Sequence, residues 1–139
     1  MDFTKALVAC LFVVTYPAHS QSNQERYALQ ERCSKQAAAT FKAEWGGNTV
    51  NSNGGQIRAS YQNHYNERLN KCFYLEISTT YKRGAETFKT LRLFDINENR
   101  EYSTFAGPET QGDLICSIDE VHCSSEQEFL RLLDPYMKD

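Results

Sequence analysis

The chain has 139 residues, of which 40% are hydrophobic, 12% aromatic and 24% charged, and this composition excludes disordered and fibrous proteins. Fifteen Lys and Arg residues stand against 18 Asp and Glu residues, so the formal net charge is −3 and nucleic acid is not the expected partner. The length suits one domain with a modest core.

The first twenty residues have the pattern of an export signal. An apolar run over residues 6–16 is too short to span a bilayer, and small residues at Ala18 and Ser20 precede a cleavage site after Ser20. We therefore predict a signal peptide over 1–20, a single domain over 21–139 and a periplasmic or secreted protein without stable membrane insertion. A lipoprotein anchored at Cys10 is the alternative, because Leu7 to Cys10 spells a lipoprotein box.

Four cysteines follow the predicted signal, at Cys33, Cys72, Cys116 and Cys123. An even number in an oxidising compartment predicts two disulfides, for which three pairings are possible. The short span between Cys116 and Cys123 favours a local loop, which leaves Cys33 to pair with Cys72. A zinc site is the alternative, but C-x-x-C and H-x-x-x-H spacings are absent from the sequence. We predict no metal and no cofactor.

Residues 22–45 predict one long helix, because they lack Gly and Pro and repeat an apolar residue every four positions. The stripe consists of Leu29, Cys33, Ala37, Phe41 and Trp45. Gly46 stands where a left-handed residue ends a helix. A polar, Gly-containing segment over 48–55 follows and is expected to be an exposed loop.

The central third of the chain predicts strands over 57–67, 71–81, 87–96 and 101–105, with a further short edge strand over 114–118. Short turns between them predict an antiparallel meander. Ser125 and Glu128 begin a final helix with a capping-box pattern, and Pro135 limits it near its end. The expected fold is α+β: a long N-terminal helix on an antiparallel meander sheet of about four strands, a short C-terminal helix and two disulfides.

The densest group of polar and aromatic residues lies between positions 61 and 72. Six of its side chains form the predicted binding surface: Tyr61, Asn63, His64, Tyr65, Asn66 and Arg68. Tyr, Asn and Arg suit adaptable recognition contacts. Two other interpretations remain open: His64 as a general base, or Asn side chains that satisfy backbone groups while the Tyr rings pack on the helix.

Several motifs give the chain a resemblance to small exported proteobacterial proteins of unknown function. The motifs are Cys33, residues 61–66, residues 69–73, Cys116, Cys123, residues 128–129 and residues 135–137. The resemblance implies only export and the cysteine layout, because no activity is attached to that group.

The sequence predicts a non-enzymatic exported protein that binds another protein or an envelope component, as inhibitors and immunity-type proteins do. It contains neither a G-x-S-x-G nor an S-x-x-K nucleophile motif, and no catalytic residue is assigned. The alternatives are a small periplasmic hydrolase that uses His64 as general base and a purely structural envelope protein.

Overall fold

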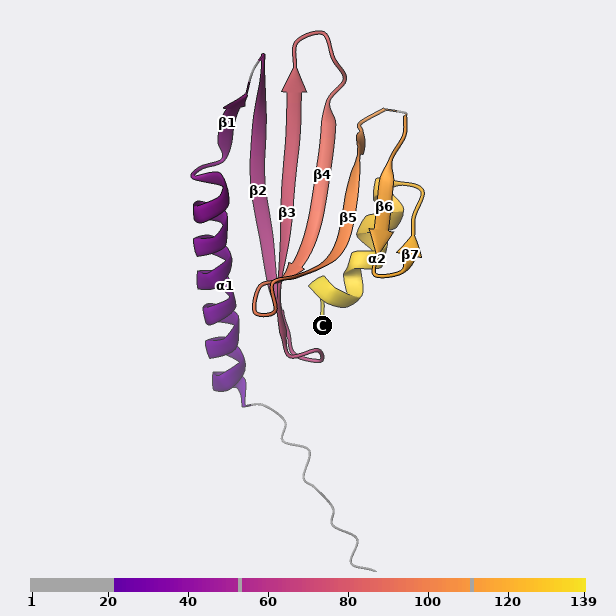
Figure 1. Cartoon of the computed structure of the whole chain (residues 1–139). Coiled ribbons are helices and arrows are strands. Elements are labelled where there is room, and N and C mark those ends of the chain that lie inside the picture. The colour runs from indigo at the N-terminus through magenta and orange to yellow at the C-terminus, as the bar shows by residue number, and fades with distance from the viewer. Residues whose placement is uncertain (1–21, 53, 111) are drawn as a thin grey trace, which may run out of the picture.

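The structure is a computed structural model that describes residues 22–139 with the exception of 53 and 111. The predicted signal peptide, its cleavage site and Cys10 lie outside the described residues. The described chain forms an α+β fold with one helix at each end and a seven-stranded antiparallel sheet between them (Figure 1). In chain order the elements are α1 (Asn23–Trp45), β1 (Thr49–Ser52), β2 (Gly55–Asn66), β3 (Lys71–Lys82), β4 (Phe88–Asp95), β5 (Arg100–Pro108), β6 (Ile115–Ile118), β7 (Val121–His122) and α2 (Glu126–Met137).

Helix α1 begins and ends as its sequence predicts. The side chain of Ser22 accepts a hydrogen bond from the backbone of Glu25, and the Glu25 carboxylate accepts one from the backbone of Ser22, so a complete capping box starts the helix. Gly46 ends it in the left-handed conformation, with φ at 65°. Within the predicted stripe Cys33, Ala37 and Phe41 are buried, which confirms the face that packs on the sheet.

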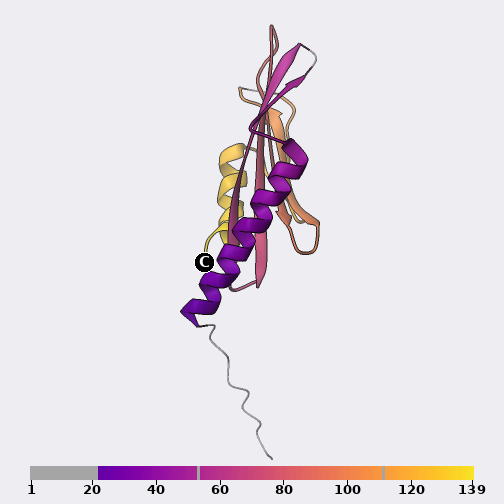
Figure 2. The ribbon, with the colours of Figure 1, turned by 90° about the vertical axis from the view of Figure 1, so that its left-hand side faces the viewer.

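The sheet is a simple meander in which each strand pairs with the next along the chain. Alternation along β3 sends neighbouring side chains to opposite faces, so Phe73 and Tyr74 belong to different hydrophobic clusters. Phe73 packs in the cluster that includes Phe129 of α2, whereas Tyr74 packs with Phe41 of α1. The two helices therefore cover opposite faces of the sheet, as the view along its edge indicates (Figure 2).

The larger cluster lies between α2 and the sheet and contains Phe73, Leu75, Leu91, Leu93, Phe105 and Phe129. The smaller cluster lies under α1, which packs mainly on β2 and to a lesser degree on β3. In Figure 1 α1 lies beside β1 and β2, α2 lies behind β5 and β6, and no helix passes in front of β4, β5 and β6. One face of these three strands is thus left open by the described helices.

Both predicted disulfides are present. Cys33 of α1 pairs with Cys72 of β3 across 39 residues, and Cys116 of β6 pairs with Cys123 across seven. The first attaches the long helix to the sheet, and the second closes the β6–β7 hairpin ahead of α2. Such bonds are typical of an oxidising extracytoplasmic compartment. Across the described segments, no helix has the length and apolar character that crossing a membrane requires.

The strands differ from the prediction at the two edges of the sheet. The segment expected to be a loop over 48–55 includes β1, which pairs with the start of β2, and the sheet ends in β7 beyond the predicted edge strand. Strand β1 is short and mostly polar, and β7 has only two residues, so neither shows the alternation on which strand prediction depends. Backbone pairing with a longer neighbour holds them in place.

Helix α2 begins at its predicted N-cap, Ser125, but with only half of the predicted capping box. The Ser125 hydroxyl accepts a hydrogen bond from the backbone of Glu128, as a capping box requires. The Glu128 carboxylate bonds instead to the backbone and hydroxyl of Ser124, one residue earlier. Pro135 is accommodated inside the helix, which ends two residues later at Met137.

Candidate functional site

The side of the predicted binding surface that faces α1 is tied to that helix. The ring of Tyr61 lies between Phe41 and Tyr74, with ring centroids 4.9 and 5.5 Å away. Tyr65 is buried, and its hydroxyl donates to Asn70 at 2.6 Å. These tyrosines pack as part of the interface between α1 and β2.

The amide of Asn63 belongs to the same interface. Its Nδ2 donates to Ser34 Oγ on α1 at 3.0 Å, next to the Cys33 sulfur. One turn earlier on the helix, Gln30 Oε1 accepts the backbone N–H of Tyr65 at 3.0 Å. The alternating positions of β2 on this side therefore hold the long helix in register with the sheet.

The other three predicted residues face α2 and fasten its end. Asn66 has an exposed fraction of 0%, and its Nδ2 lies 3.0, 3.2 and 3.3 Å from the carbonyl oxygens of Pro135, Tyr136 and Lys138. Arg68 donates to the same Pro135 carbonyl at 2.9 Å. His64 Nε2 lies 3.3 Å from Asp139 Oδ1.

The structure thus brings the six predicted residues together on β2 and the turn after it, in contact with both helices. Their contacts are those of the structural interpretation, in which the amides satisfy backbone groups and the tyrosines pack on the helix. A role for them in binding a partner stays a prediction.

The open face of β4, β5 and β6 lies on the opposite side of the sheet from α2. Register aligns Arg92 of β4 with Thr104 of β5, and Thr104 with Ser117 of β6, so these three side chains share one face. They are partly exposed, and Ile115 on the same face has an exposed fraction of 63%. Hydroxyl, charged and apolar groups therefore meet the solvent side by side.

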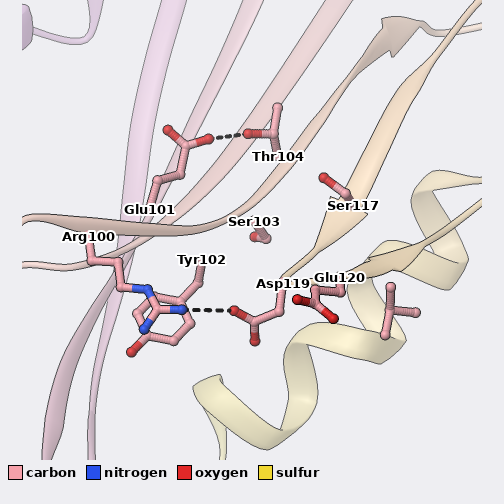
Figure 3. Close-up of a pocket in the computed structure, with 9 residues that line it drawn as sticks. Arg100, Glu101, Tyr102, Ser103, Thr104, Ser117, Asp119 and Glu120 are labelled. Carbon is pink, nitrogen blue, oxygen red and sulfur yellow. Dashed lines mark hydrogen bonds and ion pairs between the residues drawn. The ribbon is translucent and has the colours of Figure 1, made fainter.

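A broad hollow of about 870 Å³ lies at the start of β5, between that strand and the β6–β7 hairpin (Figure 3). Arg100 lies 3.5 Å from Asp119 across it, and the Thr104 hydroxyl donates to Glu101. Four of the lining residues are charged: Arg100, Glu101, Asp119 and Glu120. Three of these four are acidic, so the hollow carries net negative charge.

A chain of polar contacts connects this hollow with the end of α1. Trp45 Nε1 donates to Glu76 Oε2 at 2.8 Å, and the other Glu76 oxygen lies 3.6 Å from the Arg92 guanidinium. Arg92 also donates to Glu101 Oε2 at 2.7 Å and stacks on the ring of Phe94 with its guanidinium carbon 4.6 Å from the ring centroid. The open face is therefore crossed by a ladder of alternating charge.

Glu44 of α1 lies beside Glu76 and extends this ladder at its α1 end, and its pKa shifts in the direction opposite to that of Glu101. Burial is the largest influence on Glu101 and acts to raise its pKa, but hydrogen bonds from Arg92 and Thr104 act against it and leave the pKa lowered. Burial raises the pKa of Glu44, and the charge of Glu76 and a hydrogen bond between the two carboxyls raise it further. Glu101 is thus the more strongly ionised carboxylate, and Glu44 the one that holds its proton longer.

Neither a metal centre nor a cysteine nucleophile is assembled in the part of the chain that the structure describes. No group of three or more His, Cys, Asp or Glu residues there could hold a metal ion. Cys123, which follows His122 in the sequence, is bonded to Cys116 and so is not a thiolate.

Three comparisons with known proteins were made, and none gives a match. No protein-family model, no curated protein and no solved structure matches this chain. The resemblance to exported proteobacterial proteins therefore stays an expectation.

Sequence reasoning missed the ladder because its members come from different elements. Glu44 and Trp45 stand on α1, Glu76 on β3, Arg92 on β4 and Glu101 on β5. One signal was present: Glu76 is a carboxylate that directly follows the apolar run of residues 72–75 in β3, and its exposed fraction is only 6%. A charge at such a position requires partners.

Proposed function

We propose that this is a non-enzymatic exported protein that binds another protein or an envelope component through the open face of β4, β5 and β6. The observation that carries the proposal is this open face, on which no described helix packs although the opposite face is covered by α2. Its side chains are hydroxyl, charged and apolar, the mixture found at non-obligate protein interfaces.

The rigidity of the face supports the same proposal. The central strands are paired over most of their length, and the second disulfide closes the hairpin that borders the hollow. A surface that is already ordered loses little side-chain entropy when a partner docks. The two disulfides also support an oxidising compartment as the place where binding occurs.

Site-specific photocrosslinking in the native compartment tests this proposal. A photoreactive residue is placed at Ser117 on the open face, at Arg68 on the surface predicted from sequence, and at Ala38 on the exposed side of α1 as a control. We expect a discrete adduct from position 117 that excess unmodified protein competes away, and none from position 38.

A double variant tests whether this contact depends on the open face. The double variant Thr104→Arg, Ser117→Arg places two bulky charges on the open face without changing buried residues. In this variant the photoreactive residue stands at a neighbouring position of the same face, and its adduct should be abolished. An adduct that forms only at position 68 would refute the open face and favour the predicted residues of β2. Identical adducts from positions 117 and 38 would refute specific binding by the open face.

A further inference from the structure

A second, smaller cavity lies between α1 and the turn that joins β4 to β5. Its volume is about 80 Å³. It is lined by two hydroxyl-bearing residues, two carboxyl-bearing residues, one amide-bearing residue and two apolar residues: Thr40, Tyr74, Glu44, Asp95, Asn99, Phe94 and Ile96. This crevice is distinct from the broad hollow at the start of β5, and none of the predicted binding residues lines it.

Tyr74 is the unusual member of this lining. Its side chain is buried, with an exposed fraction of 1%, and its hydroxyl has no hydrogen-bond partner among the described residues. Buried hydroxyl groups are nearly always bonded, so an unpartnered one at a cavity points to a missing group. Burial, followed by the charges of Glu76 and Glu44, raises the pKa of Tyr74, so the phenol stays neutral and can accept a hydrogen bond.

The carboxyls near Tyr74 indicate that the missing group is positively charged. Glu44 stands at the crevice next to Glu76, and the two carboxyls repel each other when both are ionised. Arg92 is the nearby cation, but Glu101 shares its guanidinium through hydrogen bonds of 2.7 and 3.2 Å. Asp95, which also lines the crevice, is already paired with Lys71 at 2.7 Å. The remaining three carboxyls, of Glu44, Glu76 and Glu101, against the single guanidinium of Arg92 leave room for a further positive charge.

The size of the crevice limits what can supply this charge. Its volume corresponds to roughly two or three water molecules. That is enough for a terminal ammonium with the carbon next to it, and too little for a large organic cation. An ammonium has three N–H donors, which match a carboxylate, the Thr40 hydroxyl and the Tyr74 hydroxyl. The ring of Phe94 adds an aromatic wall that favours cations.

We propose that this crevice binds a primary ammonium group, either of a free alkylamine or of a lysine side chain on a partner. Glu44 provides the charge, Thr40 and Tyr74 accept hydrogen bonds, and Phe94 with Ile96 contacts the adjoining methylene. The inference goes beyond the proposed function, because it requires no contact with the open face.

Titration of the purified protein with methylammonium chloride, followed by backbone amide NMR shifts, tests the site. Tetramethylammonium chloride is the matched salt, since it has the same charge but no N–H donors. We expect saturable shifts near Thr40, Glu44 and Asn99 with methylammonium only. Shifts that do not saturate, or that are equal for both salts, would mean that ionic strength alone is responsible and would overturn the site.

Two variants assign the contacts. Glu44→Gln and Tyr74→Phe should each weaken methylammonium binding by at least tenfold, while thermal unfolding shows that both remain folded. Glu31→Gln is the control, because Glu31 is an exposed carboxylate on the same helix, paired with Lys35 at 2.7 Å, and its loss should leave binding unchanged. Full binding by both site variants would overturn the assignment and leave water as the occupant.

Two peptides then distinguish a lysine side chain from a free amine as the source of the ammonium group. A short peptide with one lysine, compared with the same peptide after acetylation of that lysine, tests the side chain of a partner. Binding of the peptide at least tenfold tighter than methylammonium, lost on acetylation, assigns a partner lysine; a peptide weaker than methylammonium assigns a free amine. This readout uses purified protein alone, so its failure is distinguishable from failure of the crosslinking that tests the open face.

Discussion

Replacement of Asn66 by Asp is the sharpest test of how β2 holds the end of α2. The two N–H bonds of Asn66 Nδ2 are shared among three carbonyl oxygens, and its Oδ1 accepts the backbone N–H of Leu69 at 2.9 Å. Asp keeps the acceptor for Leu69 but directs a second oxygen at the three carbonyls. Both N–H donors, worth about 1 kcal/mol each, are lost, and an unpaired buried charge is left facing carbonyl oxygens, so Asn66→Asp should destabilise the fold by about 3 kcal/mol or more at pH 7.

The pH dependence separates this mechanism from simple loss of contacts. The introduced carboxyl is fully buried and faces carbonyl oxygens, so its folded-state pKa rises above the unfolded value of about 3.9. The penalty is therefore complete above the folded-state pKa and diminishes as the pH falls toward 4, where the protonated acid can donate one hydrogen bond. Asn66→Ala loses the same donors without adding a charge, and its penalty should be independent of pH.

The assay is urea unfolding at pH 7 and pH 4, followed by the fluorescence of Trp45, the single tryptophan of the chain. The difference between the Asp and Ala variants should shrink at the lower pH. A cost below about 1 kcal/mol for Asn66→Asp at pH 7, or a cost that is the same at both values of pH, would refute the reasoning about Asn66.

Two further predictions concern the disulfides and the charge ladder. Replacing both cysteines of the Cys33–Cys72 bond by Ala should lower the free energy of unfolding by about 4 kcal/mol. The same replacement at the Cys116–Cys123 bond should lower it by about 2.5 kcal/mol, because the Cys33–Cys72 bond closes the longer loop. Urea unfolding of the two double variants measures this order, and a larger loss from the shorter loop would contradict the entropic argument. The lowered pKa of Glu101 means that its carboxylate stabilises the fold above the unfolded-state pKa and that this stabilisation is lost as the pH falls. Glu101→Gln should therefore flatten the decline in stability between pH 6 and pH 3 in the same assay, and parallel curves for variant and native protein would count against the ladder.

Residues near one another in the chain determined much of this fold. The Ser22 cap, the stripe through Cys33 and Phe41, and the left-handed Gly46 depend on spacing within one helix, so the sequence was enough to predict α1. Alternation in β3 likewise assigned Phe73 and Tyr74 to opposite faces. Short polar strands such as β1 have no such pattern, and they exist because a longer neighbour offers backbone partners.

The predicted binding surface shows the limit of reading polar residues from sequence alone. Asn63 and Asn66 have the same side chain three positions apart, and the sequence marks both as recognition residues. In the folded chain Asn63 bonds to α1, and Asn66 bonds to the last turn of α2, about 70 residues further along the chain. A hydrogen-bonding group has no predictable partner until distant segments pack, so composition could identify the stretch but not what its side chains contact.

By itself the sequence indicated the helix boundaries, the faces of the longer strands and the favoured cysteine pairing, and its even cysteine count is typical of an oxidising compartment. Only the tertiary structure decided which face of the sheet stays open, that Glu76 and Arg92 meet between the end of α1 and β5, and that Tyr74, whose hydroxyl is buried without a partner, lines a crevice with Glu44. The reason is physical. Periodicity and capping act over a few residues, whereas charge ladders and cavities arise from strand register and helix placement, which depend on the free energy of packing the whole chain.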